Sequence, residues 1–169
     1  MQQAKEPIIL GIDPGTQVTG YGLIKMKFNG YEALDFGCIR PPAKAGFPEK
    51  MLIIFNEIEK LLDTYHPDAV AVETQFVHKN AQSSMKLGMA RGIAILAAAK
   101  RKISLYEYAP KKAKLAVVGN GAASKEQVQK MIQLLLHLPA LPEPEDAADA
   151  LALALCHAHT LKNDYVRIH

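Results

Sequence analysis

Two acidic residues stand where the sequence predicts the rigid end of a buried strand. Asp13 ends the apolar run 8–12 and precedes Pro14-Gly15, a strong turn signal. Glu73 ends a second predicted strand, 68–73, whose residues 69–72 are apolar. An ionised carboxylate at such a place is costly to bury unless it meets a cation, so the pattern indicates a metal ligand. A turn capped by the Asp13 side chain itself is the structural alternative.

A second acidic pair opens the last predicted helix. Asp146 and Asp149 are three residues apart, which places both carboxyl groups on one helix face, with Cβ atoms about 5–6 Å apart. Carboxylate oxygens are the ligands that Mg²⁺ and Mn²⁺ prefer. Two such ions about 3.5–4 Å apart hold the attacking water and the leaving oxygen in phosphoryl hydrolysis. Simple capping and dipole complementation at a helix N-terminus is the alternative for this pair.

The charged residues are segregated along the chain. The formal net charge of +3 is too small to indicate a polyanionic partner by itself. Residues 100–130, however, carry eight Lys or Arg against two Glu, whereas residues 139–150 carry only acidic charges. A basic surface beside an acidic cluster suits an enzyme that grips phosphates and cuts them with metal ions. Chance clustering on a solvated surface is the alternative.

The overall composition bounds the class of protein. With 169 residues the chain predicts a single domain, 1–169, large enough to bury a core. Its two cysteines, Cys38 and Cys156, are too few for a disulfide framework and indicate reduced thiols in a cytoplasmic protein. No apolar run is long enough to cross a bilayer, and the N-terminus has no apolar signal core, so we expect no membrane association.

The apolar patterns predict an α/β fold. The first three predicted strands form an antiparallel meander with the first strand central, and a helical crossover then places the fourth strand parallel to it. Asp13 and Glu73 would then share one edge of a mixed five-stranded sheet with helices on both faces. The predicted strands are 8–13, 19–26, 31–39, 68–73 and 103–108, and the predicted helices are 48–65, 81–100, 110–117, 124–138 and 145–161.

Several helix faces carry further expectations. The glycines and alanines of helix 81–100 allow close approach, either of a second subunit or of the protein's own sheet. Leu134, Leu135 and Leu136 are expected in the core. Helix 48–65 is expected to use Leu52, Phe55, Ile58, Leu61 and Leu62 as its apolar positions. His157 and His159 are expected on the surface or in packing rather than at a metal ion.

The motifs together resemble those of the RuvC family of bacterial Holliday-junction resolvases, in order over nearly the full chain. The strand-turn motif alone is weak, because other ribonuclease H-like proteins and actin-like ATPases carry similar turns. The matching stretches are Ile-Leu-Gly-Ile-Asp-Pro-Gly-Thr at 9–16, Val-Thr-Gly-Tyr-Gly at 18–22, Val-Glu-Thr-Gln-Phe at 72–76, Lys-Leu-Gly-Met-Ala-Arg-Gly at 86–92, Val-Val-Gly-Asn-Gly at 117–121 and Asp-Ala-Ala-Asp-Ala-Leu-Ala at 146–152.

This resemblance implies a ribonuclease H-like fold and a homodimer that nicks two strands of like polarity in a four-way DNA junction, in recombination and repair. It implies 5′-phosphate and 3′-hydroxyl products and a branch-migration complex of RuvA and RuvB as partner. The family's metal-binding carboxylates fall on Asp13, Glu73, Asp146 and Asp149, which would hold Mg²⁺ as cofactor, two ions per site, with Mn²⁺ able to substitute.

The resemblance also implies DNA-contacting residues. Lys114 and Lys125 match basic residues near the scissile phosphate, where they would neutralise developing charge. Phe76 matches an aromatic that stacks on an unpaired base, a contact worth about 1–3 kcal/mol. Ordinary surface lysines and a Phe76 buried in the core are the alternatives. Further backbone contacts are expected from Lys79, Arg91, Lys111 and Lys112.

Two other functions remain as alternatives. A catalytically silent junction-binding module would bind DNA regardless of chelator and would not nick it, but acidic residues stand at all four catalytic positions. An actin-like ATPase fragment is disfavoured, because the chain leaves no room for a second lobe and carries no adenosine-site signature.

Overall fold

A mixed β-sheet forms the centre of the molecule. A computed structural model describes residues 5–74 and 80–167, with the backbone alone for 164–167. The strands of its sheet are β1 (Ile8–Asp13), β2 (Thr19–Lys27), β3 (Gly30–Ile39), β4 (Ala69–Glu73) and β5 (Ser104–Tyr108). The helices in these residues are α1 (Phe47–Tyr65), α2 (Ala81–Lys100), α3 (Pro110–Val118), α4 (Lys125–Leu135) and α5 (Glu145–Arg167). The predicted elements are therefore all present.

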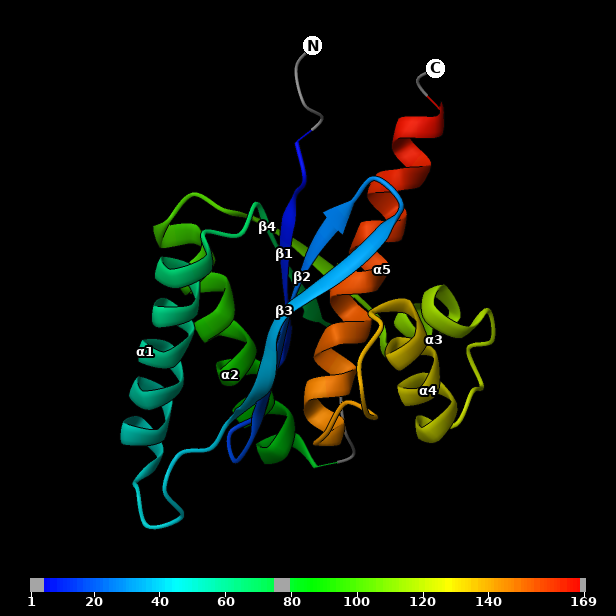
Figure 1. The fold of residues 1–169 in the computed structure, drawn as a ribbon. Helices are drawn as coiled ribbons and strands as arrows, with labels where there is room; N and C mark the ends of the chain where they lie inside the picture. Colours follow the sequence, from blue (N-terminus) through cyan, green and yellow to red (C-terminus); the bar gives the residue numbers. More distant parts are fainter. Residues whose placement is uncertain (1–4, 75–79, 168–169) are drawn as a thin grey trace.

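The strand order is β3-β2-β1-β4-β5, which makes β1 the central strand as predicted (Figure 1). The pairs β1–β2 and β2–β3 are antiparallel, whereas β1–β4 and β4–β5 are parallel. Ile12 pairs with Val72, so the next residues, Asp13 and Glu73, end neighbouring strands at the same edge. The predicted mixed sheet and its shared carboxyl edge are confirmed.

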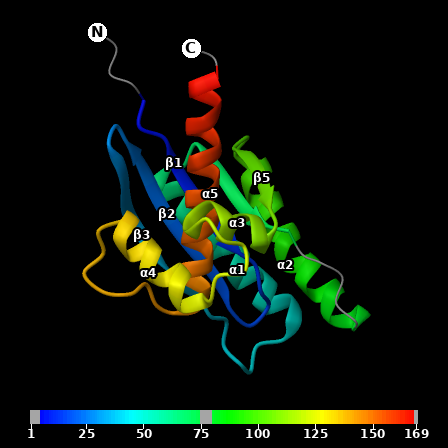
Figure 2. The same cartoon turned by 90° about the vertical axis from the view of Figure 1, so that its right-hand side faces the viewer.

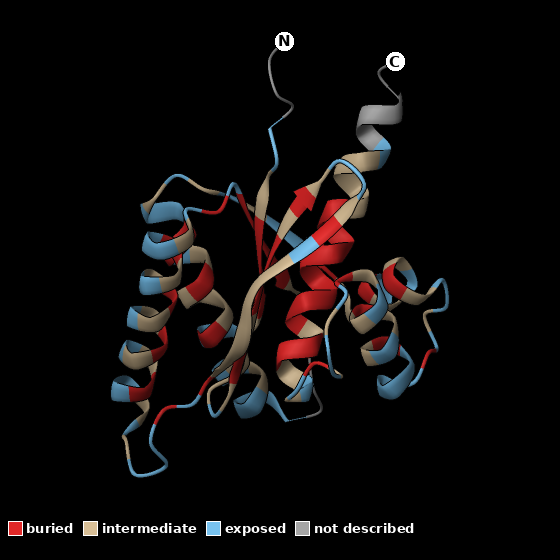
Figure 3. Cartoon of the chain, in the orientation of Figure 1, coloured by how far each residue is buried: buried red, intermediate tan, exposed pale blue. Residues whose placement is uncertain are grey.

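Helices cover both faces of this sheet. Helices α1 and α2 lie on one face, and α5, flanked by α3 and α4, lies on the other (Figures 1 and 2). Two groups of buried residues fill the two layers (Figure 3). Leu10 and Ile12 of β1 belong to the α1–α2 layer, and Ile9 belongs to the α5 layer. Because side chains alternate along a strand, Asp13 lies on the same face as Ile9, toward α5.

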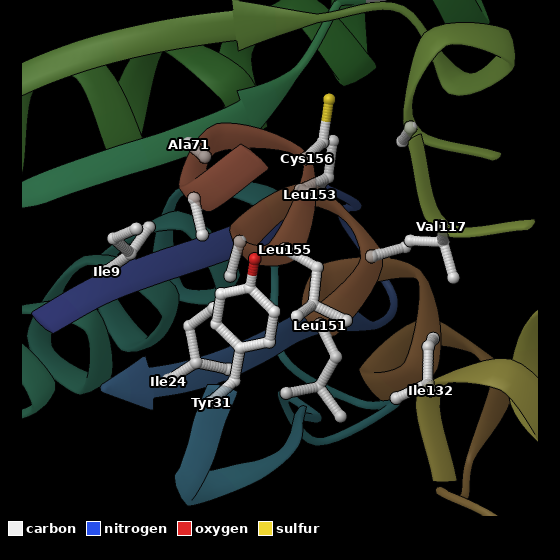
Figure 4. Packing of buried hydrophobic residues seen from close by; sticks show 14 of the residues in the cluster. Ile9, Ile24, Tyr31, Ala71, Val117, Ile132, Leu151, Leu153, Leu155 and Cys156 are labelled. Atoms are coloured by element: carbon white, nitrogen blue, oxygen red, sulfur yellow. The ribbon is translucent and has the colours of Figure 1, made fainter. Parts of the chain in front are cut away.

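Helix α5 packs on the sheet through glycines. A Cβ at Gly11 would lie 1.9 Å from the Ala150 carbonyl oxygen, and one at Gly20 would lie 2.0 Å from the Asp146 carbonyl oxygen. The bare glycine Cα atoms therefore let the helix backbone come into direct contact with the strands. Farther along the helix, Leu151 and Leu155 fill the layer together with Ile24 and Tyr31 (Figure 4).

Some apolar positions were predicted wrongly. In α1 the buried face consists of Lys50, Ile54, Ile58 and Leu62, while Leu52 is 58% exposed. In the leucine run only Leu136 is buried, and Leu134 is 68% exposed. Three consecutive residues cannot share one face of a helix that turns about 100° per residue.

The ends of helices α4 and α5 also differ from the predicted ends. Helix α4 ends three residues early because His137 is left-handed, at φ 52°, and the Leu138 N–H bonds the Gln133 carbonyl in a Schellman arrangement before Pro139. Helix α5 continues to Arg167, beyond the predicted end at 161.

Cys38 and Cys156 are free thiols. Within residues 5–74 and 80–167, no helix is both long and apolar enough to span a membrane.

Candidate active site

Asp13 and Glu73 form the floor of an acidic cluster at the carboxyl edge of β1 and β4. Burial, followed by repulsion from Glu73, Asp149 and Asp146, raises the pKa of Asp13 to about 8. Burial, followed by repulsion from Asp149, also raises the pKa of Glu73. A hydrogen bond between the two carboxyl groups raises the pKa of Asp13 and lowers that of Glu73. Without a cation, burial and mutual repulsion therefore disfavour the simultaneous ionisation of Asp13 and Glu73.

The first turns of α5 supply the other two carboxylates. Gly20 is the register partner of Asp13 and lies directly beneath the Asp146 backbone, so the glycine contact brings Asp146 to the end of β1. Asp149 lies one turn further on. Burial is the largest cause that raises the pKa of Asp149, with Asp146 adding repulsion and Lys125 opposing it. All four predicted acids thus interact electrostatically from three separate elements.

The alternatives of turn capping and helix capping do not account for these acids. The turn after β1 is closed by Thr19, whose hydroxyl donates to the Gly15 carbonyl at 2.7 Å and accepts from the Gly15 N–H at 3.3 Å. At the start of α5 the Ala147 and Ala148 N–H groups bond to the Pro144 carbonyl oxygen. These backbone hydrogen bonds are made without the carboxylates, which instead interact electrostatically with one another.

The chemistry of this donor set fits a hard divalent cation. Among residues 5–74 and 80–167, no group of three or more Asp, Glu, His or Cys side chains is arranged so that it could hold a metal ion as it stands, so the fit is one of donor chemistry. Burial first, and repulsion between the carboxyl groups second, raise the pKa values of Asp13, Glu73 and Asp149, so ionising these groups together is unfavourable. A divalent cation would remove this repulsion, and oxygen donors favour Mg²⁺ or Mn²⁺.

Two of the predicted lysines lie beside the acidic cluster. Lys114, half-buried on α3, lowers the pKa values of Glu73 and Asp149 by its positive charge. Lys125, at the start of α4, interacts with Asp146 and Asp149 and forms an ion pair with Glu145 at 2.6 Å. The helical pair α3–α4 therefore places two positive charges at one side of the carboxylates.

The remaining predicted DNA contacts are more scattered. Lys111 passes its aliphatic chain over Gly121, and the Lys112 Nζ lies 5.2 Å above the Tyr108 ring, both on the exposed side of α3. Arg91 on α2 forms an ion pair with Glu107 on β5, so its guanidinium already has an acidic partner. Phe76 and Lys79 lie outside the described residues.

Helix α2 separates its small residues between two sides. Ala94, Ala97 and Ala98 pack in the layer formed with β1 and β4, which agrees with the predicted packing of this helix on the protein's own sheet. Gly88 and Gly92 face away from it, with open space around the position of a Cβ. A second surface of small residues therefore remains on the outside of this helix.

His157 is buried in packing, in agreement with prediction. It is 1% exposed, its Nδ1 lies 2.7 Å from the Tyr108 hydroxyl and its ring stacks on Tyr106.

Sequence reasoning missed Glu145, the partner of Lys125. The only signal for it was its position next to the acidic pair, which suggested no more than the start of a helix.

The fold and the cluster define an α/β protein of the ribonuclease H-like type with a carboxylate site at the sheet edge. The family model described as crossover junction endodeoxyribonuclease RuvC matches residues 9–157. The chain is 59% identical to the protein of that name from Protochlamydia amoebophila, over 92% of each chain. Its fold matches that of Thermus thermophilus RuvC in complex with a Holliday junction substrate, with a TM-score of 0.88 and 32% identity over 94% and 96% of the two chains.

A further relative from Ruminiclostridium cellulolyticum, also called crossover junction endodeoxyribonuclease RuvC, is 46% identical over 90% of this chain and 92% of that protein. With matches of this extent, the chain belongs to the RuvC family of crossover junction endodeoxyribonucleases.

Proposed function

We propose that the protein is a metal-dependent endonuclease that resolves four-way DNA junctions by symmetric nicks in two strands of like polarity. The products would carry 5′-phosphate and 3′-hydroxyl ends, and the reaction would serve recombination and repair. The observation that carries this proposal is the convergence of Asp13, Glu73, Asp146 and Asp149 at one sheet edge. Family membership supports the junction as substrate.

The carboxylates are proposed to hold two Mg²⁺ ions, with Mn²⁺ able to substitute. When bound, these ions would supply an activated water and stabilise the leaving oxygen. Asp13 and Glu73 lie on rigid strands, so they would set the position of the ions relative to the sheet. Asp146 and Asp149 would close the site from α5. A bound cation would favour the ionised form of Asp13, which is the form that acts as a ligand.

The basic residues are proposed to bind and orient the DNA. Lys114 and Lys125 lie close enough to the carboxylates to neutralise charge that develops on the scissile phosphate. Lys125 would exchange its ion pair with Glu145 for the phosphate, and Lys111 and Lys112 would contact the backbone farther out. For Phe76 the proposal is stacking on an unpaired base, and for Lys79 and Arg91 phosphate contacts.

A homodimer is proposed through the outer face of α2. Met85, Gly88, Met89 and Gly92 follow one another at helical spacing, with Met85 and Met89 65% and 51% exposed. Exposed methionines beside glycines provide apolar area and close approach of a second helix. A twofold dimer would present two sites to a junction that is itself nearly twofold. Sedimentation should give a dimer for the wild type and a monomer for Met89→Asp; a dimer in both would place the interface elsewhere.

Within the cell we propose a cytoplasmic role together with a branch-migration complex of RuvA and RuvB. This partner is an expectation from the family. Four-way junctions arise and move in cytoplasmic DNA, and a resolvase acts on the junction that such a motor delivers.

The proposal is tested with a synthetic four-way junction and a linear duplex of the same sequence, each with and without Mg²⁺. We expect paired nicks in the junction only, dependent on Mg²⁺ and absent in Asp13→Asn. Equal digestion of both DNAs would contradict junction specificity. Junction binding that is unaffected by chelator, without any nicking, would instead support the silent binding module.

A further inference from the structure

The turn between β1 and β2 contains a contact that the carboxylate mechanism does not use. Lys50 in the first turn of α1 is only 8% exposed, and its Nζ donates a 3.0 Å hydrogen bond to the Gln17 Oε1. Among the described residues, no carboxylate lies within ion-pair distance of this ammonium group. Lys50 is therefore a largely buried lysine whose ammonium group is partnered by a neutral amide rather than by a carboxylate, an arrangement that leaves its positive charge uncompensated by the protein.

This contact determines which way the Gln17 amide points. A lysine ammonium group has only donors, so the amide oxygen of Gln17 must face Lys50 and the amide NH₂ must face away from it. Gln17 is exposed, so its two N–H donors point to the outside of the protein. The buried Thr19 and its double hydrogen bond with Gly15 hold the turn that carries Gln17.

The turn lies next to the catalytic cluster. Gln17 is four residues beyond Asp13 in the β1–β2 turn, and this turn lies at the same end of the sheet as the start of α5 (Figure 1). A DNA strand that approaches the carboxylates meets repulsion from them, and donors beside the cluster would offset it. The lysines of α3 and α4 provide positive charge from the α5 side, whereas on the α1 side Lys50 provides a positive charge and Gln17 provides neutral N–H donors.

We infer that Gln17 donates its amide N–H groups to a phosphate of the DNA strand next to the scissile one, and that Lys50 is the positioning residue that fixes this orientation. The inference rests on the proposed function, because it takes junction DNA as the ligand. A backbone phosphate fits best, since the buried ammonium group attracts an anion and amide donors suit its oxygens. The contact adds a DNA-binding residue on the opposite side of the site from Lys114.

The test measures the affinity of the full-length protein for a labelled four-way junction in buffer with EDTA, alongside the melting temperature. Gln17→Glu removes the donors but gives Lys50 a charged partner, so we expect about tenfold weaker binding with no loss of melting temperature. Gln17→Met, which removes the donors without adding charge, should weaken binding similarly. Asn29→Asp, an exposed site at the far end of β2, adds the same charge as Gln17→Glu and should bind within twofold of wild type.

Lys50→Met separates positioning from simple structural support. If Lys50 acts through Gln17, Lys50→Met should weaken binding, and Gln17→Met should then have a much smaller further effect in this background. Additive effects of the two changes would refute the positioning role. Gln17 variants that bind within twofold of Asn29→Asp would overturn the inference altogether. A wild-type protein that does not bind the junction would instead contradict the proposed function.

Discussion

The two faces of the central sheet are built by different kinds of contact. On the α1–α2 face, side chains such as Leu10, Ile54 and Val70 fill the space between helix and strand. On the α5 face, side chains such as Ile24 and Leu155 fill a layer too, but at Gly11 and Gly20 the helix backbone itself touches the strands. Side-chain layers adjust when one residue changes, whereas a backbone contact has no flexible group to give way. The face that carries the acidic cluster is therefore the less adjustable one.

This difference explains how α5 positions the site. Asp146 interacts with Asp13 because its own backbone rests on Gly20, the register partner of Asp13. The accuracy of a metal site depends on such rigid support. On the opposite face, ion pairs of Arg101 with Glu59 and Asp63 join α1 to α2 at the surface, where small shifts have no chemical consequence.

The largest effect should come from removing a carboxylate on the α5 face. Asp13→Asn should lower junction nicking on the order of 10³-fold, because it removes a negative oxygen that would hold the metal ions. Gel assays with a labelled junction and Mg²⁺ measure this. The matched change Asp63→Asn, on the exposed side of α1, should leave nicking within twofold of wild type. Equal losses in both variants would mean that the two faces do not differ in chemistry.

The backbone contact is broken most directly by Gly20→Ala. Its Cβ would lie 2.0 Å from the Asp146 carbonyl oxygen, so the start of α5 must move. We expect destabilisation of about 1–3 kcal/mol and, at temperatures where the variant is folded, nicking reduced on the order of 10²-fold. Gly46→Ala is the control: its Cβ would meet no atom closer than 4.0 Å and its backbone conformation suits alanine, so stability should change by less than about 1 kcal/mol. Thermal unfolding with nicking assays distinguishes the two; full activity in Gly20→Ala would show that the contact does not position Asp146.

A smaller effect is expected from the charge beside the cluster. Lys114→Met should reduce nicking about tenfold, since Lys114 opposes the negative charge at Glu73 and Asp149. The control is Lys130→Met on α4, which removes a lysine paired with Glu126 away from the cluster and should have little effect. If the two variants lose activity equally, the effect of Lys114 is one of net charge alone.

The acidic face should also change the pH dependence of stability. The pKa of Asp13 rises from 3.8 to about 8 in the fold, so the folded chain binds a proton that the unfolded chain has released. The contribution of the Asp13 proton to the free energy of unfolding is fully present below about pH 4 and declines as the pH rises toward 8. In metal-free buffer, Asp13→Asn should therefore gain at least about 1 kcal/mol over wild type at pH 8, since one pKa unit is worth about 1.4 kcal/mol. Denaturant unfolding at pH 5 and pH 8 measures the difference in free energy of unfolding between Asp13→Asn and the wild type. A difference that becomes smaller from pH 5 to pH 8 would contradict a raised pKa of Asp13.

The sequence predicted those parts of the site that follow from strand order. An apolar run that ends on an acid, followed by a helical crossover to a second such run, places Asp13 and Glu73 together by general rules of sheet topology. The contact of Gly20 with Asp146 was not predictable in the same way. Glycines at positions 20 and 22 are compatible with a close approach of backbone or ligand, but only the packed helix identifies what approaches.

The face of a helix was harder to predict where apolar residues are consecutive. Residues 51–55 of α1 are all apolar, so the pattern does not fix which of them face the sheet. Ile54 is buried, Leu52 is exposed, and the polar Lys50 takes a place on the buried face. The same ambiguity produced the error at Leu134. The roles of Phe76 and Lys79 stay predictions, because they fall outside the described residues.

The central claim is that α5, held on glycines, completes a divalent metal site with the strand carboxylates. The most direct test is titration of Mn²⁺ into the DNA-free protein, followed by electron paramagnetic resonance, for the wild type and Asp146→Asn. We expect the wild type to bind Mn²⁺ and Asp146→Asn to bind it at least about tenfold more weakly. Equal Mn²⁺ affinity in the two proteins would contradict the central claim.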